Sequence, residues 1–331
     1  MLKSTHSVTG IHECGFENIS ELVKIASFIP VGLGSTLCNG VIIAAILSQK
    51  NIRQRREFQI INALAIADFV EGFSTMIGGV YRVAVIKAGL KNAQFSCIQC
   101  MLLPQSWLWR WADFSTSFML LVLSIDRLIS VATPFAYFRL GPTYSRIMVG
   151  TPYTLSLLFS MFAWVHPLSS ATKISMLCMT REFISATFYQ YSKYLTATAS
   201  ALSVFVYIPL LVVMRSQVIY ISRKVSLTQV SLFMTYSDRK RRSQLRVTKT
   251  IAFSSLCTLL LDAIPRAVGM YGMVEEMKAA DQKCDSLFLY LFHLTKLNSM
   301  LNVCLYYTRH KPMRTAMRHL FHCSVPPPAP R

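Results

Sequence analysis

Acidic residues are scarce in this chain of 331 residues, which has 15 Asp and Glu against 34 Lys and Arg. Charged residues of both signs make up only 15% of it, whereas 53% of the residues are hydrophobic. A single soluble domain rarely has this composition. The basic residues do not form a stripe interleaved with stacking aromatic residues, so nucleic acid is not the predicted partner. The composition predicts a membrane protein.

Other patterns are also missing, and each absence argues against a class of protein. Residues 1–21 have no basic segment followed by an apolar one, so we do not expect a signal peptide there. No spacing of Cys and His resembles a zinc site. Clustered catalytic groups are absent, so we do not expect an enzyme. The two halves are not self-similar, as a transporter with internal repeats would require, and a transporter is kept only as an alternative.

Long apolar runs, by contrast, are abundant. A helix needs about 20 residues to cross the hydrocarbon core of a bilayer, and seven runs of about that length predict an all-α membrane protein, a bundle of seven transmembrane helices. The predicted spans are 22–47, 58–83, 106–132, 147–168, 194–221, 247–274 and 287–307.

The basic residues indicate how this bundle lies in the cell membrane. Most of the 34 Lys and Arg lie after the first, third, fifth and seventh spans, on one side of the predicted bundle. By the positive-inside rule that side is cytoplasmic. We therefore divide the chain into an extracellular N-terminus (1–21), a seven-helix domain (22–308) and a cytoplasmic tail (309–331).

The outer segments contain groups that suit an oxidising compartment. Asn18 begins a glycosylation sequon, which is usable only on an outer face. A disulfide from Cys97 or Cys100 to Cys178 would join the start of the third span to the second outer loop, where oxidation is permitted. Cys14 and Cys284 offer a second pairing, and connectivity cannot be read from sequence.

The third span has polar residues at three depths. Trp109 and Arg110 lie near its start, where an indole and a cation suit the headgroup boundary. Asp113 follows one turn deeper, and because an aspartate is expensive in lipid we expect it to face the interior and to carry a function. Asp126 and Arg127 are adjacent at the opposite membrane face, and we expect this pair to act as a releasable ionic contact.

Further polar residues occur within the other spans. Asn39 is in the first span, and Asp68 is in the second. Thr116 is on the third, and Asn298 and Asn302 are one turn apart on the seventh. Such groups are expected to converge and satisfy one another. An aspartate among hydroxyl and amide oxygens also suits a small hard cation, so this cluster predicts either a sodium site or a hydrogen-bonded packing cluster without an ion.

These residues, in this order, resemble motifs of the rhodopsin-like G-protein-coupled receptors, and within them of the nematode serpentine chemosensory receptors. The resemblance covers essentially the whole chain. Its motifs are Asn39, the box Leu64 to Asp68, the sequence Ser124 to Leu128, the prolines Pro209 and Pro265, and the set Asn298, Asn302 and Tyr306.

Several positions depart from the family pattern. Leu128 replaces the tyrosine of the box that contains Arg127, and Val303 replaces the proline of the seventh helix. No tryptophan precedes Pro265, where Asp262, Ala263 and Ile264 stand instead. These differences suggest a divergent receptor.

The resemblance implies a receptor that binds an extracellular ligand, a small chemosensory or neuromodulatory molecule, and activates a heterotrimeric G protein. Arrestin is a further candidate partner. Asp126, Arg127 and Tyr306 would couple to the G protein. Sodium, at Asp68 and its neighbours, would favour the inactive state.

Lys296 stands ten residues before Tyr306, the spacing at which opsins have the lysine that binds retinal, which makes a photoreceptor the alternative function. We expect instead that Lys296 pairs with Asp113 or Asp262, because an unpaired charge at this depth is strongly disfavoured. Together with Trp109 and Arg110, these charged residues would then line a ligand pocket for a small polar or zwitterionic molecule. We predict no cofactor apart from the sodium ion.

After the last span the sequence predicts a short amphipathic eighth helix. Its apolar residues recur at helical spacing with Arg314 and Arg318 between them, a pattern typical of a helix that lies flat on a membrane. Cys323 follows directly and is a candidate for palmitoylation. The apolar residues are Met313, Ala316, Met317, Leu320 and Phe321.

Overall fold

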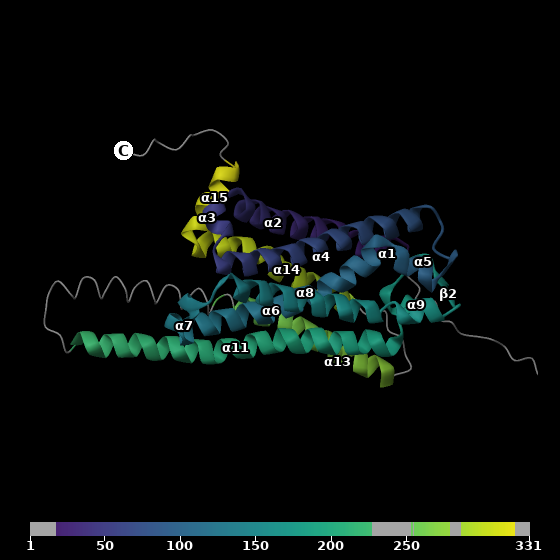
Figure 1. The fold of residues 1–331 in the computed structure, drawn as a ribbon. Helices are drawn as coiled ribbons and strands as arrows, with labels where there is room; N and C mark the ends of the chain where they lie inside the picture. Colours follow the sequence, from purple (N-terminus) through teal and green to yellow (C-terminus); the bar gives the residue numbers. More distant parts are fainter. Residues whose placement is uncertain (1–17, 227–252, 254, 279–285, 322–331) are drawn as a thin grey trace, which may run out of the picture.

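A computed structural model describes residues 18–226, 253, 255–278 and 286–321. These residues form a bundle of seven helical segments whose long axes run roughly side by side (Figure 1). The segments are α1 (Asn18–Ala26) with α2 (Phe28–Ser48), α4 (Arg56–Lys87), α6 (Pro104–Ala132), α8 (Pro142–Phe162) with α9 (Val165–Ser169), α11 (Ala186–Ser226), the π-helix η1 (Leu259–Ala263) with α13 (Ile264–Lys278), and α14 (Ser286–Arg309).

Short elements close the two ends of the bundle. At one end, here called the sheet end, β1 (Gln94–Ser96) pairs antiparallel with β2 (Lys173–Ser175). The opposite end, called the α15 end, also has short helices near it (Figure 1). The short helices are α5 (Cys97–Leu102) and α10 (Thr180–Phe183) at the sheet end, and α3 (Lys50–Arg53), α7 (Pro134–Arg139) and α15 (Lys311–Phe321) at the other.

The apolar character of the helices fits a membrane. Within the described residues, five helical stretches are long and apolar enough to span a bilayer. The predicted sixth span begins outside the described residues, and the seventh forms α14. Large apolar side chains lie exposed on the outside of the bundle, as lipid-facing surfaces require. The five stretches are Leu22–Ser48, Arg56–Lys87, Pro104–Ala132, Pro142–Ser169 and Ala186–Val213.

One predicted boundary is wrong for a clear reason. The fifth span was predicted from residue 194, but α11 begins at Ala186. The intervening residues include the polar Ser192 and Lys193, and both face the interior of the bundle. Ser192 accepts a hydrogen bond from Arg110 at 3.1 Å, and Lys193 pairs with Asp113. Polar residues that have buried partners do not end a helix.

The backbones of α2 and α4 approach each other closely. A Cβ atom on Gly32 would lie 2.5 Å from the backbone nitrogen of Met76, and one on Gly72 would lie 2.8 Å from the Cβ of Ser35. Real side chains do not tolerate such contacts, so glycine is required at both positions. Two helices in backbone contact share a tightly packed interface.

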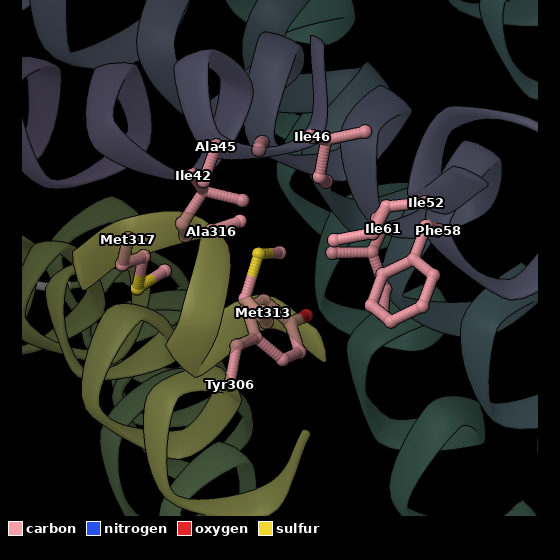
Figure 2. Close-up of a cluster of buried hydrophobic side chains, with 11 residues drawn as sticks. Ile42, Ala45, Ile46, Ile52, Phe58, Ile61, Tyr306, Met313, Ala316 and Met317 are labelled. Carbon is pink, nitrogen blue, oxygen red and sulfur yellow. The ribbon is translucent and has the colours of Figure 1, made fainter. Parts of the chain in front are cut away.

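A buried apolar cluster closes the α15 end of the bundle. It joins residues of α2, α3, α4, α14 and α15, whose side chains point toward one another (Figure 2). Met313 and Ala316 are completely buried there, whereas Phe321 is 72% exposed. The apolar face predicted for the eighth helix therefore packs partly on the protein itself. The cluster includes Ile42, Ala45, Ile46, Ile52, Phe58, Ile61, Tyr306, Met313, Ala316 and Met317.

A disulfide closes the sheet end. Cys100 of α5 is bonded to Cys178, which follows β2, with their Cα atoms 5.4 Å apart. Of the two candidates for the partner of Cys178, Cys97 is therefore the free thiol, and its sulfur lies 3.1 Å from the hydroxyl of Thr172. Cys14 and Cys284 lie outside the described residues. The bridge ties the loop between α9 and α11 to α5, the short helix directly before α6.

Candidate functional site

A cavity of about 180 Å³ lies within the bundle toward the sheet end. Helices α4, α6, α10, α11, α13 and α14 all contribute to its wall. Trp109 and Asp113, both predicted for a ligand pocket, line it, whereas Arg110, Asp262 and Lys296 do not. The residues on its wall are Glu71, Trp109, Asp113, Arg181, Tyr189, Lys193, Thr196, Pro265, Arg266, Gly269, Met270, Leu291, Phe292 and Thr295.

Asp113 is surrounded by cations. Its carboxylate accepts a hydrogen bond from Arg266 at 2.8 Å and lies 3.4 Å from the ammonium of Lys193 and 3.8 Å from Arg110. Arg266 also donates to Asp262 at 2.9 Å. The side chain of Asp113 is only 3% exposed. We call these five residues the Asp113 cluster.

Asp262 of the Asp113 cluster lies in the π-helix η1. A π turn widens a helix by one residue, and such turns occur frequently at functional sites. Asp262 lies within η1, and Arg266 lies one helical turn later, just after Pro265. The sequence indicated an unusual residue set before Pro265 but did not indicate the π turn itself.

Lys296 has a partner that the sequence analysis did not consider. Its ammonium is ion-paired with Glu71 of α4, and both side chains are at most 4% exposed. The expected pairing with Asp113 or Asp262 is therefore wrong, because those carboxylates are already paired with Arg266. Glu71 lies one turn after Asp68 on the same face of α4, a spacing that could have identified it.

The four residues predicted to bind sodium do come together. Asp68, Thr116, Asn298 and Asn302 line a small cavity of about 10 Å³, next to the larger one. Thr116 donates to Asp68 at 3.1 Å and is 3.4 Å from Glu71. Asn39 reaches the same region through Ser299, to which it donates at 2.8 Å.

A second ionic cluster lies near the other end of α6. Arg127 is 3.3 Å from the carboxylate of Glu57 and 3.7 Å from that of Asp126. The other oxygen of Asp126 accepts hydrogen bonds from the hydroxyls of Tyr137 and Tyr144, at 3.2 and 3.3 Å. We call these five residues the Arg127 cluster. Glu57, Tyr137 and Tyr144 were not among the predicted residues.

Two titratable groups at this end lie outside the membrane-spanning segments. Burial, followed by the nearby carboxylate of Asp126, raises the pKa of Tyr137 to about 12, so its hydroxyl keeps its proton and donates. Burial, together with the positive charge of Arg309, lowers the pKa of His310 to about 4, so this ring is neutral at physiological pH.

The amino-acid sequence matches the model of a known family. Residues 38–306 match the family model of the seven-transmembrane receptors of the rhodopsin family. The chain belongs to this family. No curated protein matches the receptor at a significant level.

The lining of the small cavity bears on the predicted sodium site. Lys296 and Arg266 line that cavity together with the carboxylates of Asp68, Glu71 and Asp262. A cavity of about 10 Å³ has room for about one water-sized particle. The ammonium of Lys296 would repel a sodium ion there, whereas the three carboxylates would attract it, so the sodium site stays a prediction.

Some predicted residues have neither a confirmed nor a rejected role. Asn18 begins α1, and Cys323 lies outside the described residues. Tyr306 is 7% exposed and packs in the apolar cluster of the α15 end. Among the described residues, no group of three or more His, Cys, Asp and Glu side chains could hold a metal ion.

Proposed function

We propose that this receptor binds an extracellular ligand in the cavity beside Asp113 and activates a heterotrimeric G protein at its α15 end. The single observation that carries the proposal is the arrangement on α6. One helix of a rhodopsin-family bundle contributes Asp113 to a cavity at one end and Arg127 to an ionic cluster at the other. A helix shared by both places can link occupancy of one to release of the other.

The proposed orientation follows from charge. The α15 end has the basic segments that the positive-inside rule assigns to the cytoplasm. The sheet end contains the disulfide from Cys100 to Cys178, which suits an oxidising exterior. The ligand cavity would then open outward, and Arg127 would face the G protein.

Arg127 is the residue we expect to act at the cytoplasmic face. In the resting state Glu57 and Asp126 neutralise it, and its side chain is 11% exposed. When these contacts break, a guanidinium with five donors can reach carbonyl oxygens of a partner. Tyr137 and Tyr144 donate to Asp126 and so keep its carboxylate in position beside Arg127.

The test measures nucleotide exchange on co-expressed G protein without added ligand, as GTPγS binding to membranes. Asp126→Asn keeps an acceptor for the tyrosines but removes the charge, and should raise basal exchange severalfold. Glu57→Gln should raise it as well, because Arg127 loses a second anion. Adding Arg127→Ala to Asp126→Asn should return exchange to that of membranes without receptor.

The matched control is Arg146→Ala, which removes an exposed arginine of α8 that lies outside the Arg127 cluster. It should leave the raised exchange of Asp126→Asn intact. Surface labelling of each variant separates signalling from expression. Full exchange by an Asp126→Asn, Arg127→Ala protein that reaches the surface would contradict the proposal.

Helix α15 is proposed to lie against the inner membrane surface. Met313 and Ala316 attach it to the bundle, and the exposed Phe321 is left for lipid. Palmitoylation of Cys323, two residues later, would add a second anchor. Arrestin is proposed to bind the same face as the G protein.

A photoreceptor is the alternative function, and Glu71 gives it some support. A retinal Schiff base on Lys296 would need a carboxylate counterion, and Glu71 is paired with that lysine. However, Lys296 is not among the residues that line the cavity of about 180 Å³. Uptake of retinal with a red-shifted absorbance, lost in Lys296→Ala, would favour this alternative.

A further inference from the structure

We infer that the ligand of this receptor is a small organic anion, a carboxylate or a similar acid with an apolar body. The inference rests on the proposed ligand site and names its ligand class. It also narrows the expectation of a polar or zwitterionic ligand. Three properties of the Asp113 cluster and its cavity lead to it: an excess of positive charge, one cation that can be released, and an apolar wall beside that cation.

The first property is the charge of the cluster. Arg110, Lys193 and Arg266 supply three positive charges, whereas Asp113 and Asp262 supply two negative ones. The other carboxylate on the cavity wall, Glu71, is neutralised by Lys296. Within the Asp113 cluster itself the cations therefore outnumber the carboxylates by one, and a buried excess of this sign attracts an incoming anion.

In the part of the chain that the structure describes, Arg110 is the cation of the cluster that has buried donor atoms without a hydrogen-bond partner. Its side chain is fully buried, yet among the described residues its Nε and Nη2 atoms have no hydrogen-bond partner. The guanidinium lies 5.1 Å from the ring of Trp109 and 5.8 Å from that of Tyr189, which stabilise a cation without neutralising it. Both rings line the cavity.

The second property is that Lys193 can be released. Its side chain is 23% exposed, the most exposed of the three cations, and it lies on the cavity wall. If a ligand binds the ammonium of Lys193, Asp113 keeps Arg266 at 2.8 Å and Arg110 at 3.8 Å. Binding an anion therefore leaves no buried carboxylate without a partner, which is the costly outcome.

The third property is the apolar wall. Trp109 and Tyr189 flank Lys193, whose ammonium is 4.9 Å from the indole ring. Leu291 and Phe292 of α14 and Met270 of α13 also line the cavity. A pocket of aromatic and aliphatic side chains with a few charged groups fixes the orientation of an amphiphilic ligand. The acid group would lie at Lys193, and the apolar body would lie between these side chains.

The experiment compares three probes that share one body. Purified receptor is heated with 3-phenylpropionate, 3-phenylpropylamine or 3-phenylpropanol at equal concentrations, and the melting temperature is recorded. A ligand that binds only the folded state raises this temperature. We expect the carboxylate to raise it most, the alcohol less, and the amine not at all.

Lys193→Gln tests the named contact. Loss of a hydrogen bond to a charged group should weaken carboxylate binding by roughly tenfold or more. The melting temperature without probe should stay close to that of the wild type, because Asp113 keeps two cations. Lys173→Gln, the same change on β2 at the same end but off the cavity wall, is the matched control and should bind the carboxylate normally.

The outcomes separate this inference from the proposed function. Stabilisation by the amine equal to or above that by the carboxylate would overturn the inference, and so would unchanged carboxylate binding in Lys193→Gln. Preferential binding of the carboxylate supports it, whether or not GTPγS exchange follows. Binding without exchange in the assay described above would count against G-protein activation and leave the ligand class in place.

Discussion

Two buried ionic sites in this receptor differ in how many partners the central charge has. Asp113 is in contact with three cations, Arg110, Lys193 and Arg266. Lys296 is ion-paired with one carboxylate, that of Glu71. A charge that several partners share can lose one of them at small cost, whereas loss of an exclusive partner leaves a buried charge unpaired. The site at Asp113 can therefore exchange one partner for a ligand, whereas the pair of Lys296 and Glu71 stabilises the fold.

The Arg127 cluster lies between these two cases. Arg127 has two carboxylate partners, Glu57 on α4 and Asp126 on its own helix. Loss of either leaves one contact, so each single change should weaken the resting state without abolishing it. The number of partners thus orders the three sites by how easily the central charge can lose one partner: Lys296 least easily, then Arg127, then Asp113.

Among the changes that test this difference between shared and exclusive partners, replacement of Lys296 should have the largest effect on stability. Lys296→Ala leaves Glu71 buried without a cation, and breaking such a pair typically costs about 3–5 kcal/mol. We expect most of the surface expression to be lost, as measured by antibody labelling of intact cells. Adding Glu71→Gln should restore much of it, because the neutral amide needs no cation.

Two other variants provide the controls for this experiment. Asp113→Asn combined with Lys296→Ala should not rescue expression, because Asp113 is not the partner of Lys296. Lys193→Gln alone should be expressed normally, because the charge it contacts is shared. Equal loss of expression in Lys193→Gln and Lys296→Ala would remove the distinction between shared and exclusive partners.

A moderate effect concerns sodium. If the ammonium of Lys296 takes the place of an ion beside Asp68, replacing sodium chloride with the chloride of a large inert cation should leave the melting temperature of purified receptor unchanged. In Lys296→Gln the amide keeps a hydrogen-bonding group near Glu71 but no charge. Sodium should then raise the melting temperature of that variant. A sodium-dependent rise in the wild type would show that Lys296 does not replace the ion.

An effect that is absent at neutral pH and appears only on acidification is expected at His310, a titratable group outside the three ionic sites. Its ring lies 5.3 Å from that of Phe58, and among the described residues its Nε2 atom has no hydrogen-bond partner. Its folded pKa is about 4, below the ordinary value of 6.5, so the folded state binds fewer protons between these values. Its contribution to stability is complete above pH 6.5 and is lost as the pH falls toward 4.

Melting temperatures of purified receptor across this range provide the measurement. The wild type should lose more stability on acidification than His310→Gln, which cannot gain a proton. Carboxylates elsewhere titrate in both proteins and cancel in the difference. Parallel pH profiles for the two proteins would mean that His310 is solvated in the folded state.

Much of the fold could be predicted from the sequence, because the length of an apolar run directly reflects the thickness of a bilayer. The family, the order of the helices and the end of the bundle that has the disulfide could all be predicted from such local patterns. The convergence of Asp68 with Thr116, Asn298 and Asn302 could be predicted too, since each group is costly in lipid and must find polar neighbours.

The ion pairs could not be predicted in the same way. Which acid meets which base depends on the rotation and depth of separate helices, and neither is set by a local pattern. Lys193 fell just outside a predicted span, and Arg266 follows a proline. Glu71 is the exception, because its position one turn after Asp68 places both carboxylates on one face.

The backbone contact between α2 and α4 has a mechanical consequence. Where Gly32 and Gly72 bring two helices together with no side chain between them, the helices cannot slide past each other without collision. We therefore expect α2 and α4 to move as one unit. A movement that frees Arg127 would then be one of α6 relative to this pair, and Glu57, at the start of α4, would keep its position. Activation would then be a withdrawal of Arg127 from a fixed carboxylate.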